Sequence, residues 1–204
     1  MSGQQPPPFQ TFIQEGPGWE GIGSKLQYAN DYLQVYLATV RTPSRPAGAL
    51  WTVVHRKAAA VVAPMRADGR LVLIRQERIP VRAALWEFPA GQIDSPGEGD
   101  DAAIRATARR ELREESGYEL GPGGELIAMG CFYSSPGFTD EHAYLFLARG
   151  VIPAAGGAEP DENEAIEGCR AFTVEELRGM IAENEVRDAN TLSAFARLTA
   201  LGFI

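Results

Sequence analysis

The stretch RRELREESGY, residues 109–118, constrains the fold more than any other part of the chain. Glu111, Glu114 and Glu115 are three and four residues apart, so in a helix their carboxylates share one face. Gly117 follows the pattern and marks the end of that helix. A solvated helix with ion pairs would carry the same residues. Three like charges on one face repel each other, however, so the spacing indicates that arginines or a cation neutralise them.

The rest of the chain predicts strands interleaved with a few helices. The glutamate helix should begin near Asp100 or Asp101, because acidic residues suit the positive end of a helix, and should end at Gly117. Strand patterns occupy residues 33–40, 49–56, 58–64, 70–77, 125–133, 142–150 and 167–173, and helical patterns occupy residues 173–184 and 189–202. Thr173 and Glu176 form the sequence of a capping box. This order predicts the α/β class, as a sandwich around a mixed sheet.

The chain should divide into two regions. Residues 1–56 are predicted to hold an arm, loosely ordered to about residue 25 because of its prolines and glycines, and a small β-sheet extension. Residues 57–204 should form the main domain. A short apolar run ends at Pro89 and Gly91, where we expect a loop to begin.

Composition limits the partners and the compartment. The net charge is −8 with a pI near 4.9, which argues against binding to nucleic acid or to an anionic membrane surface. Cys131 and Cys169 give no disulfide framework. Neither a signal peptide nor a long apolar run is evident, so we expect a cytoplasmic protein without a membrane span.

The residue types indicate which cation could bind. Carboxylates on one helix face, with only two histidines in the chain, favour a hard cation such as Mg²⁺, with Mn²⁺ as a possible substitute. Mg²⁺ usually keeps waters and shares its shell with substrate phosphates. Arg110 precedes Glu114 by four residues, so it could fix the rotamer of a carboxylate.

The segment GQIDSPGEGDDAAIRATARRELREESGY resembles the signature of the Nudix hydrolases. The second half of the signature matches fully, at Arg110, Glu111, Leu112, Glu114, Glu115, Gly117 and Tyr118. In the first half, six residues instead of five separate Gly91 from Glu98, and eleven instead of seven separate Glu98 from Arg110. In strict register the early glutamate falls on Ala102. Either a longer helix displaces Glu98 by ~6 Å along its axis, or the loop absorbs the extra residues.

Further segments are similar to the ADP-ribose pyrophosphatase branch of that family. They are LWEFPAGQID, YSSPGFTDE with Pro136, and DENEAIEGCRAFTVEEL. The resemblance implies a Nudix-type α/β/α sandwich. It also implies that the Ala90 carbonyl, Glu111 and Glu115 bind the metal, with Glu98 as a further candidate ligand. Glu114 would be a further ligand, a catalytic residue or a close support of the ligands. The general base would come from the late acidic loop, as Glu164 or alternatively Glu162.

The same resemblance implies a substrate site and a dimer. Glu87 would lie beside the substrate phosphates, and Arg56 and Arg78 near the phosphates and terminal ribose. Asp140 would contact the ribose. Members of this branch pair through their N-terminal sheets and enclose the adenine between aromatic residues of both subunits. Tyr32 and Trp51 stand at matching places, so we expect a homodimer.

The expected activity is Mg²⁺-dependent hydrolysis of the pyrophosphate bond of ADP-ribose or a related small-molecule nucleotide sugar, giving AMP (or another NMP) and a sugar phosphate. Two alternatives stay open. One is another sugar nucleotide, such as GDP-mannose. The other is a non-catalytic nucleotide sensor that keeps the Nudix fold.

Overall fold

The computed structural model describes residues 16–93, 100–160 and 164–204. The strands are β1 (Glu20–Ala29), β2 (Leu33–Thr42), β3 (Arg45–Arg56), β4 (Ala59–Arg66), β5 (Leu71–Arg78), β6 (Ala83–Glu87), β7 (Ala90–Gln92), β8 (Tyr118–Tyr133), β9 (His142–Pro153) and β10 (Ile166–Phe172). The helices are α1 (Asp101–Ser116), α2 (Val174–Ala182), α3 (Ala189–Ala200) and the short 3₁₀ helix η1 (Ile79–Val81). Among these helices, none is both long enough and apolar enough to cross a membrane.

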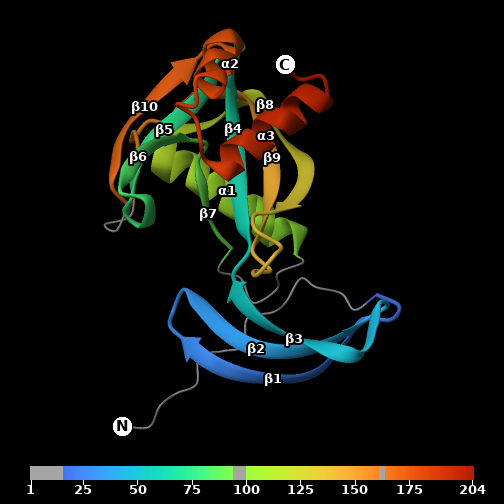
Figure 1. Cartoon of the computed structure of the whole chain (residues 1–204). Helices are drawn as coiled ribbons and strands as arrows, with labels where there is room; N and C mark the ends of the chain where they lie inside the picture. Colours follow the sequence, from blue (N-terminus) through green and yellow to red (C-terminus); the bar gives the residue numbers. More distant parts are fainter. Residues whose placement is uncertain (1–15, 94–99, 161–163) are drawn as a thin grey trace.

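The central sheet is mixed. Its strands follow the order β10-β5-β4-β9-β8, with β6 paired to β5 and β7 paired to β4 (Figure 1). Strands β4 and β9 run parallel, whereas the other described pairs are antiparallel. The continuous apolar composition of β4 suits a strand that is covered on both faces.

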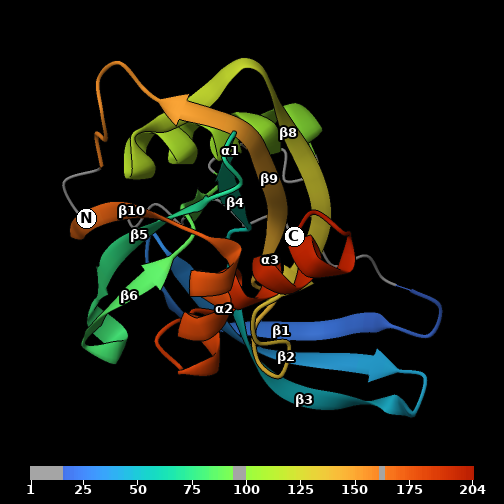
Figure 2. The ribbon, with the colours of Figure 1, turned by 90° about the horizontal axis from the view of Figure 1, so that it is seen from above.

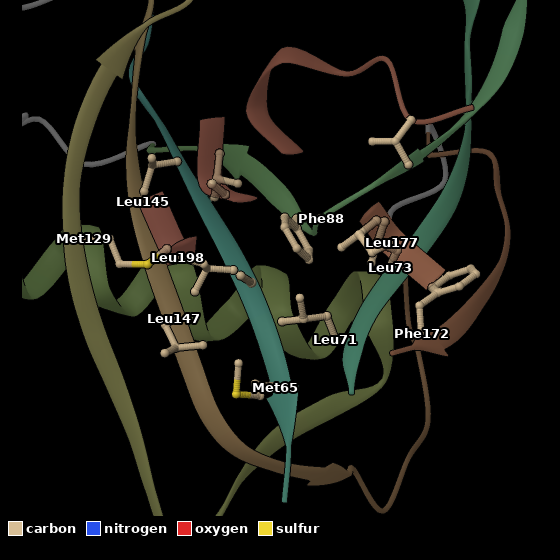
Figure 3. Close-up of a cluster of buried hydrophobic side chains, with 14 of the residues drawn as sticks. Met65, Leu71, Leu73, Phe88, Met129, Leu145, Leu147, Phe172, Leu177 and Leu198 are labelled. Carbon is tan, nitrogen blue, oxygen red and sulfur yellow. The ribbon is translucent and has the colours of Figure 1, made fainter. Parts of the chain in front are cut away.

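Alternate residues of β4 serve two cores on opposite faces of the sheet. Val61 and Ala63 belong to a cluster with Leu177 and Leu198 from the side of α2 and α3 (Figure 3). The residues between them, Ala60 and Val62, belong to a second cluster, with Ile104, Ala108 and Leu112 of α1. Figure 2 shows α1 on one side of the sheet and the α2–α3 pair on the other. The predicted α/β/α sandwich is therefore confirmed.

Local sequence signals set the ends of the helices. The Asp100 carboxylate accepts a hydrogen bond from the Ala102 amide at 3.0 Å. Gly117 ends α1 with a φ of 68°, a left-handed conformation that glycine adopts without steric cost. Thr173 and Glu176 form the predicted capping box of α2. The predicted positions of all three α-helices are confirmed.

The N-terminal region forms a second, three-stranded antiparallel sheet in the order β1-β2-β3. Figure 1 shows this sheet set apart from the sandwich, and the chain passes from one to the other where β3 leads into β4. The prediction of a loose arm to about residue 25 is wrong from Glu20 onward, because that residue begins β1. Gly21 and Gly23 hide the strand pattern in the sequence, but pairing with β2 supplies the backbone hydrogen bonds. The division into domains at residue 56 stays a prediction.

Candidate active site

Three glutamates from two distant segments converge beside α1. One carboxylate oxygen from each of Glu111, Glu115 and Glu164 lies within 4.8 Å of the others. The first two stand one turn apart on α1, and the third lies just before β10. Glu111 is 3% exposed and Glu115 is 1% exposed. Buried carboxylates are costly unless they are paired or bind a cation, so this cluster has the chemistry of a cation site.

The segment after Pro89 contacts the cluster through the backbone of Ala90. The Ala90 amide donates a hydrogen bond to Oε2 of Glu115 at 2.7 Å. Residues 90–92 form β7, which pairs with β4 through Ala90 and Val61. The expectation that a loop begins here is therefore wrong, because pairing with β4 holds the segment as a strand. The backbone of Ala90 thus lies at the cluster, while coordination by its carbonyl stays a prediction.

Gly91 is a site residue that the sequence indicated only as the start of a loop and as the first glycine of the signature, without a role of its own. A Cβ at this position would overlap the carboxylate of Glu111, whose farther oxygen would lie only 2.7 Å away. The absence of a side chain at Gly91 is what leaves room for that carboxylate. The resemblance to the family signature, which begins with this glycine, was the signal that could have identified it.

Arg110 organises the outer side of the cluster. Its guanidinium binds Glu111 and also donates to Oε2 of Glu114 at 2.7 Å. The expectation that Arg110 holds a carboxylate is confirmed. Glu114 lies outside the group of three converging glutamates, and its side chain is 32% exposed. Its position favours a supporting role, and a role as ligand or catalyst stays a prediction.

The electrostatics of Glu115 suit a cation. Burial raises the pKa of Glu115 to about 9, the Ala90 hydrogen bond opposes this, and repulsion from Glu164 and Glu111 adds to it. A divalent cation would remove that repulsion and favour the ionised form. The residues present therefore fit a hard divalent cation held by Glu111 and Glu115, with the Glu164 carboxylate close by.

Arg78 and Glu87 form a forked ion pair next to the cluster. Nε of Arg78 donates to both oxygens of Glu87, at 3.0 and 3.2 Å, and Nη2 donates to Oε2 at 2.6 Å. Burial raises the pKa of Glu87, although the Arg78 hydrogen bond opposes this. The Arg78 pKa is raised by its hydrogen bond to Glu87 and further by the charges of Asp188 and Glu115. This arginine therefore contributes positive charge near the buried glutamates.

A second group of predicted residues gathers around the loop of residues 134–141. The carboxylate of Asp140 accepts from the Arg56 amide at 3.1 Å and also contacts Nδ1 of His55. Nη1 of Arg56 pairs with Glu141 at 2.6 Å, whereas its buried Nε has no hydrogen-bond partner among the described residues. Asp140 thus ties the end of β3 to this loop, and its contact with a ribose stays a prediction.

Both predicted aromatic residues are exposed, Trp51 on β3 and Tyr32 in the connection between β1 and β2. Trp51 is 51% exposed and its indole donates to the Gly137 carbonyl at 2.8 Å. Tyr32 is 62% exposed. Such exposure is compatible with a stacking role, which remains a prediction for each. Two other predicted residues, Glu98 and Glu162, lie outside the described residues.

The architecture and the glutamate cluster define an α/β/α sandwich protein with a candidate cation site. The family model described as NUDIX domain matches residues 54–195, so the chain belongs to the Nudix hydrolase family. The ADP-ribose pyrophosphatase of Bacillus subtilis (strain 168) is 32% identical over 177 residues, covering 87% of this chain and 90% of that relative. The methanol dehydrogenase activator of Bacillus methanolicus is 31% identical over 173 residues, covering 85% and 88%.

A solved structure described as an ADP compounds hydrolase has the same fold. Its TM-score is 0.71, and the match covers 97% of this chain and 99% of that chain. The sequence identity is 18%, so this likeness concerns the fold alone.

Proposed function

We propose that this chain is a Mg²⁺-dependent hydrolase that cleaves the pyrophosphate bond of ADP-ribose or a related nucleoside diphosphate sugar. The products would be AMP, or another NMP, and a sugar phosphate. The observation that carries this proposal is the convergence of Glu111, Glu115 and Glu164 within 4.8 Å. When bound there, Mg²⁺ would supply the charge neutralisation and water activation that an inert pyrophosphate requires.

The residues of the chain have distinct tasks in this proposal. Glu111 and Glu115 hold the cation with the backbone of Ala90. Glu164 orients a water and accepts its proton, as expected of a carboxylate that approaches the cluster from a separate segment. Glu162 is the alternative base, from the same acidic run.

Two arginines are suited to the anionic part of the substrate. The Arg78 side chain is 40% exposed although it pairs with Glu87, so its guanidinium can also meet a phosphate. The Arg56 side chain is 37% exposed although it pairs with Glu141, so its guanidinium can meet a phosphate as well. The whole chain has a net charge of −8, and both arginines would supply local positive charge at the site.

The choice of substrate rests on the aromatic residues and on the relatives. Exposed Trp51 and Tyr32 offer flat surfaces on which a base can stack. The relative with 32% identity is named an ADP-ribose pyrophosphatase, which supports ADP-ribose as the first substrate to test. The relative named an activator of methanol dehydrogenase shows that similar identity accompanies different names. GDP-mannose remains the alternative substrate, and nucleotide sensing without turnover the alternative function.

The N-terminal sheet supports the proposal of a homodimer. Tyr28 and Leu50 are each more than half exposed, and their pairing with Val35 and Thr39 of β2 puts them on one face of the sheet. A three-stranded sheet usually needs one apolar face covered for stability. Pairing with the same sheet of a second copy would cover these side chains. A cytoplasmic location is proposed from the sequence features given above.

A substrate screen tests the proposed function. The purified protein is incubated with Mg²⁺ and a panel of ADP-ribose, ADP-glucose, GDP-mannose and UDP-glucose, and the products are identified by mass. We expect the highest kcat/KM for ADP-ribose, with AMP and a pentose phosphate as products. A preference for GDP-mannose would make that compound the substrate in place of ADP-ribose. Mg²⁺-dependent binding without turnover of any compound would favour the alternative function of a nucleotide sensor.

A further inference from the structure

Gln76 carries a side-chain amide whose oxygen lies buried. Its side chain is on β5 and is 5% exposed. Its buried Oε1 has no hydrogen-bond partner among the residues that the structure describes. Burying such a group without a partner is costly, so a glutamine here needs a compensating contact that a bound species can supply.

The sheet register places this amide on the face of the glutamate helix. Leu71 and Leu73 of β5 belong to the core on the side of α2 and α3. Side chains alternate along a strand, so Ile74, Gln76 and Arg78 face the opposite side, which α1 covers. Gln76 thus shares a face with Arg78, whose pKa responds to the charge of Glu115.

Both neighbouring strands bring site residues alongside Gln76. On one side β6 pairs Gln76 with Leu85 and Ile74 with Glu87, so Glu87 lies diagonally across from the amide. On the other side β10 pairs Gln76 with Ile166, two residues after Glu164. The Glu77 amide also donates to the Ala165 carbonyl at 3.0 Å, which fixes that segment next to β5. The amide is therefore flanked by the Arg78–Glu87 pair and by the segment that carries Glu164.

We propose that Gln76 is a positioning residue of the cation site, whose Oε1 accepts a hydrogen bond from a water held with the cation in the glutamate cluster. This proposal rests on the proposed function for the presence of a cation, and adds a residue to its site. A carboxamide suits the task because it accepts a hydrogen bond without adding a fourth negative charge to the cluster. Outer partners of this kind orient the groups around a metal and typically change its affinity 10–100-fold.

Cation titration of three variants tests the proposal without any substrate. Gln76→Met keeps the volume and removes the acceptor, whereas Gln76→Glu keeps an acceptor oxygen at the same place. Gln34→Met is the matched control, because Gln34 is an equally buried glutamine whose Oε1 already accepts from Tyr36 at 2.9 Å. Mn²⁺ affinity is measured by isothermal titration calorimetry, and the melting temperature of each metal-free protein by calorimetry.

We expect Gln76→Met to bind Mn²⁺ about 10–100-fold more weakly than the wild type without a fall in the metal-free melting temperature. Gln76→Glu should restore the affinity, and Gln34→Met should lower the melting temperature with unchanged affinity. Wild-type affinity in Gln76→Met, or its unfolding in the absence of metal, would overturn the role of Gln76. If Gln76 behaves as expected but no nucleotide sugar is cleaved, the role of Gln76 stands and the proposed function fails. Absence of Mn²⁺ binding by the wild type would overturn both.

Discussion

The carboxylate of Glu111 fills the position that a side chain at Gly91 would take. The Cα of Gly91 lies so close to the Glu111 carboxylate that any side chain at residue 91 would overlap it. Glu111 cannot move aside freely, because its side chain is 4% exposed and its carboxylate is bound by Arg110. A glycine in β7 and a glutamate in α1 are thus coupled by close contact, and the cation site depends on both.

Replacing Gly91 by alanine should therefore disable the site while the fold persists. The added methyl group would push the Glu111 carboxylate out of the cluster, and we expect at least a 100-fold loss of Mn²⁺ affinity and of kcat/KM, measured by calorimetry and by steady-state assay. Gly179→Ala is the control, since nothing lies within 4 Å of its Cβ position in α2. It should leave activity intact and add about 1 kcal/mol of stability. Equal activity of the two alanine variants would contradict the coupling.

Cation binding should depend steeply on pH. In the absence of metal the Glu115 pKa is raised from 4.5 to about 9, chiefly by burial, so binding must release a proton below pH 9. We expect the apparent Mg²⁺ affinity to rise by up to about tenfold per pH unit between pH 7 and 9. Calorimetry in buffers of different ionisation enthalpy would report the released proton. A flat profile over this range would mean that Glu115 is already ionised in the metal-free protein.

The same pKa gives the sign of a stability change. Between pH 4.5 and 9 the folded metal-free protein holds a proton on Glu115 that the unfolded chain releases. This contribution to stability is complete below pH 4.5 and is lost as the pH rises through 9. The melting temperature of the metal-free protein should therefore decline from pH 7 to pH 9 more steeply than that of Glu115→Gln.

The fold was predictable where its signals are local. Asp100 and Gly117 limit α1 through a side-chain cap and a left-handed turn, both readable from residue type. Strand β1 was missed because its glycines interrupt the alternation, and its pairing with β2 is a tertiary contact. The glycines can be seen in the sequence, whereas the pairing that holds them in a strand cannot.

The candidate site divides in the same way. The spacing of Glu111 and Glu115 along α1 follows from helix geometry. The approach of Glu164 was expected only from a family resemblance, since helix periodicity has no bearing on a loop so far along the chain. Gln76 lies in the charged second half of β5, and its missing hydrogen bond is a property of three-dimensional packing alone.

Arg78 should bind the substrate in addition to pairing with Glu87. Arg78→Met leaves a buried carboxylate without its partner, so we expect a loss of about 1–3 kcal/mol in the free energy of unfolding, together with a higher KM. The double variant Arg78→Met/Glu87→Leu removes both charges and should recover stability but not KM. Recovery of KM as well would mean that the arginine only neutralises Glu87. Chemical denaturation and steady-state kinetics provide the two readouts.

The identity of the base can be separated from that of the cation ligands. We expect Glu164→Gln to lower kcat by about 100-fold or more, because a glutamine cannot accept the proton of the water, while Mn²⁺ still binds. Glu162→Gln should change kcat little. A strong loss in Glu162→Gln with near-normal turnover in Glu164→Gln would assign the base to Glu162.

The most direct test of the glutamate cluster follows ADP-ribose hydrolysis by ³¹P NMR as Mg²⁺ is added to metal-free protein, with Glu115→Gln alongside the wild type. The wild type should produce AMP and ribose 5-phosphate only after Mg²⁺ is added. Glu115→Gln should remain folded by circular dichroism and form no product at any Mg²⁺ concentration. Full activity of Glu115→Gln, or hydrolysis by the wild type without a divalent cation, would contradict the assignment of this cluster as the catalytic centre.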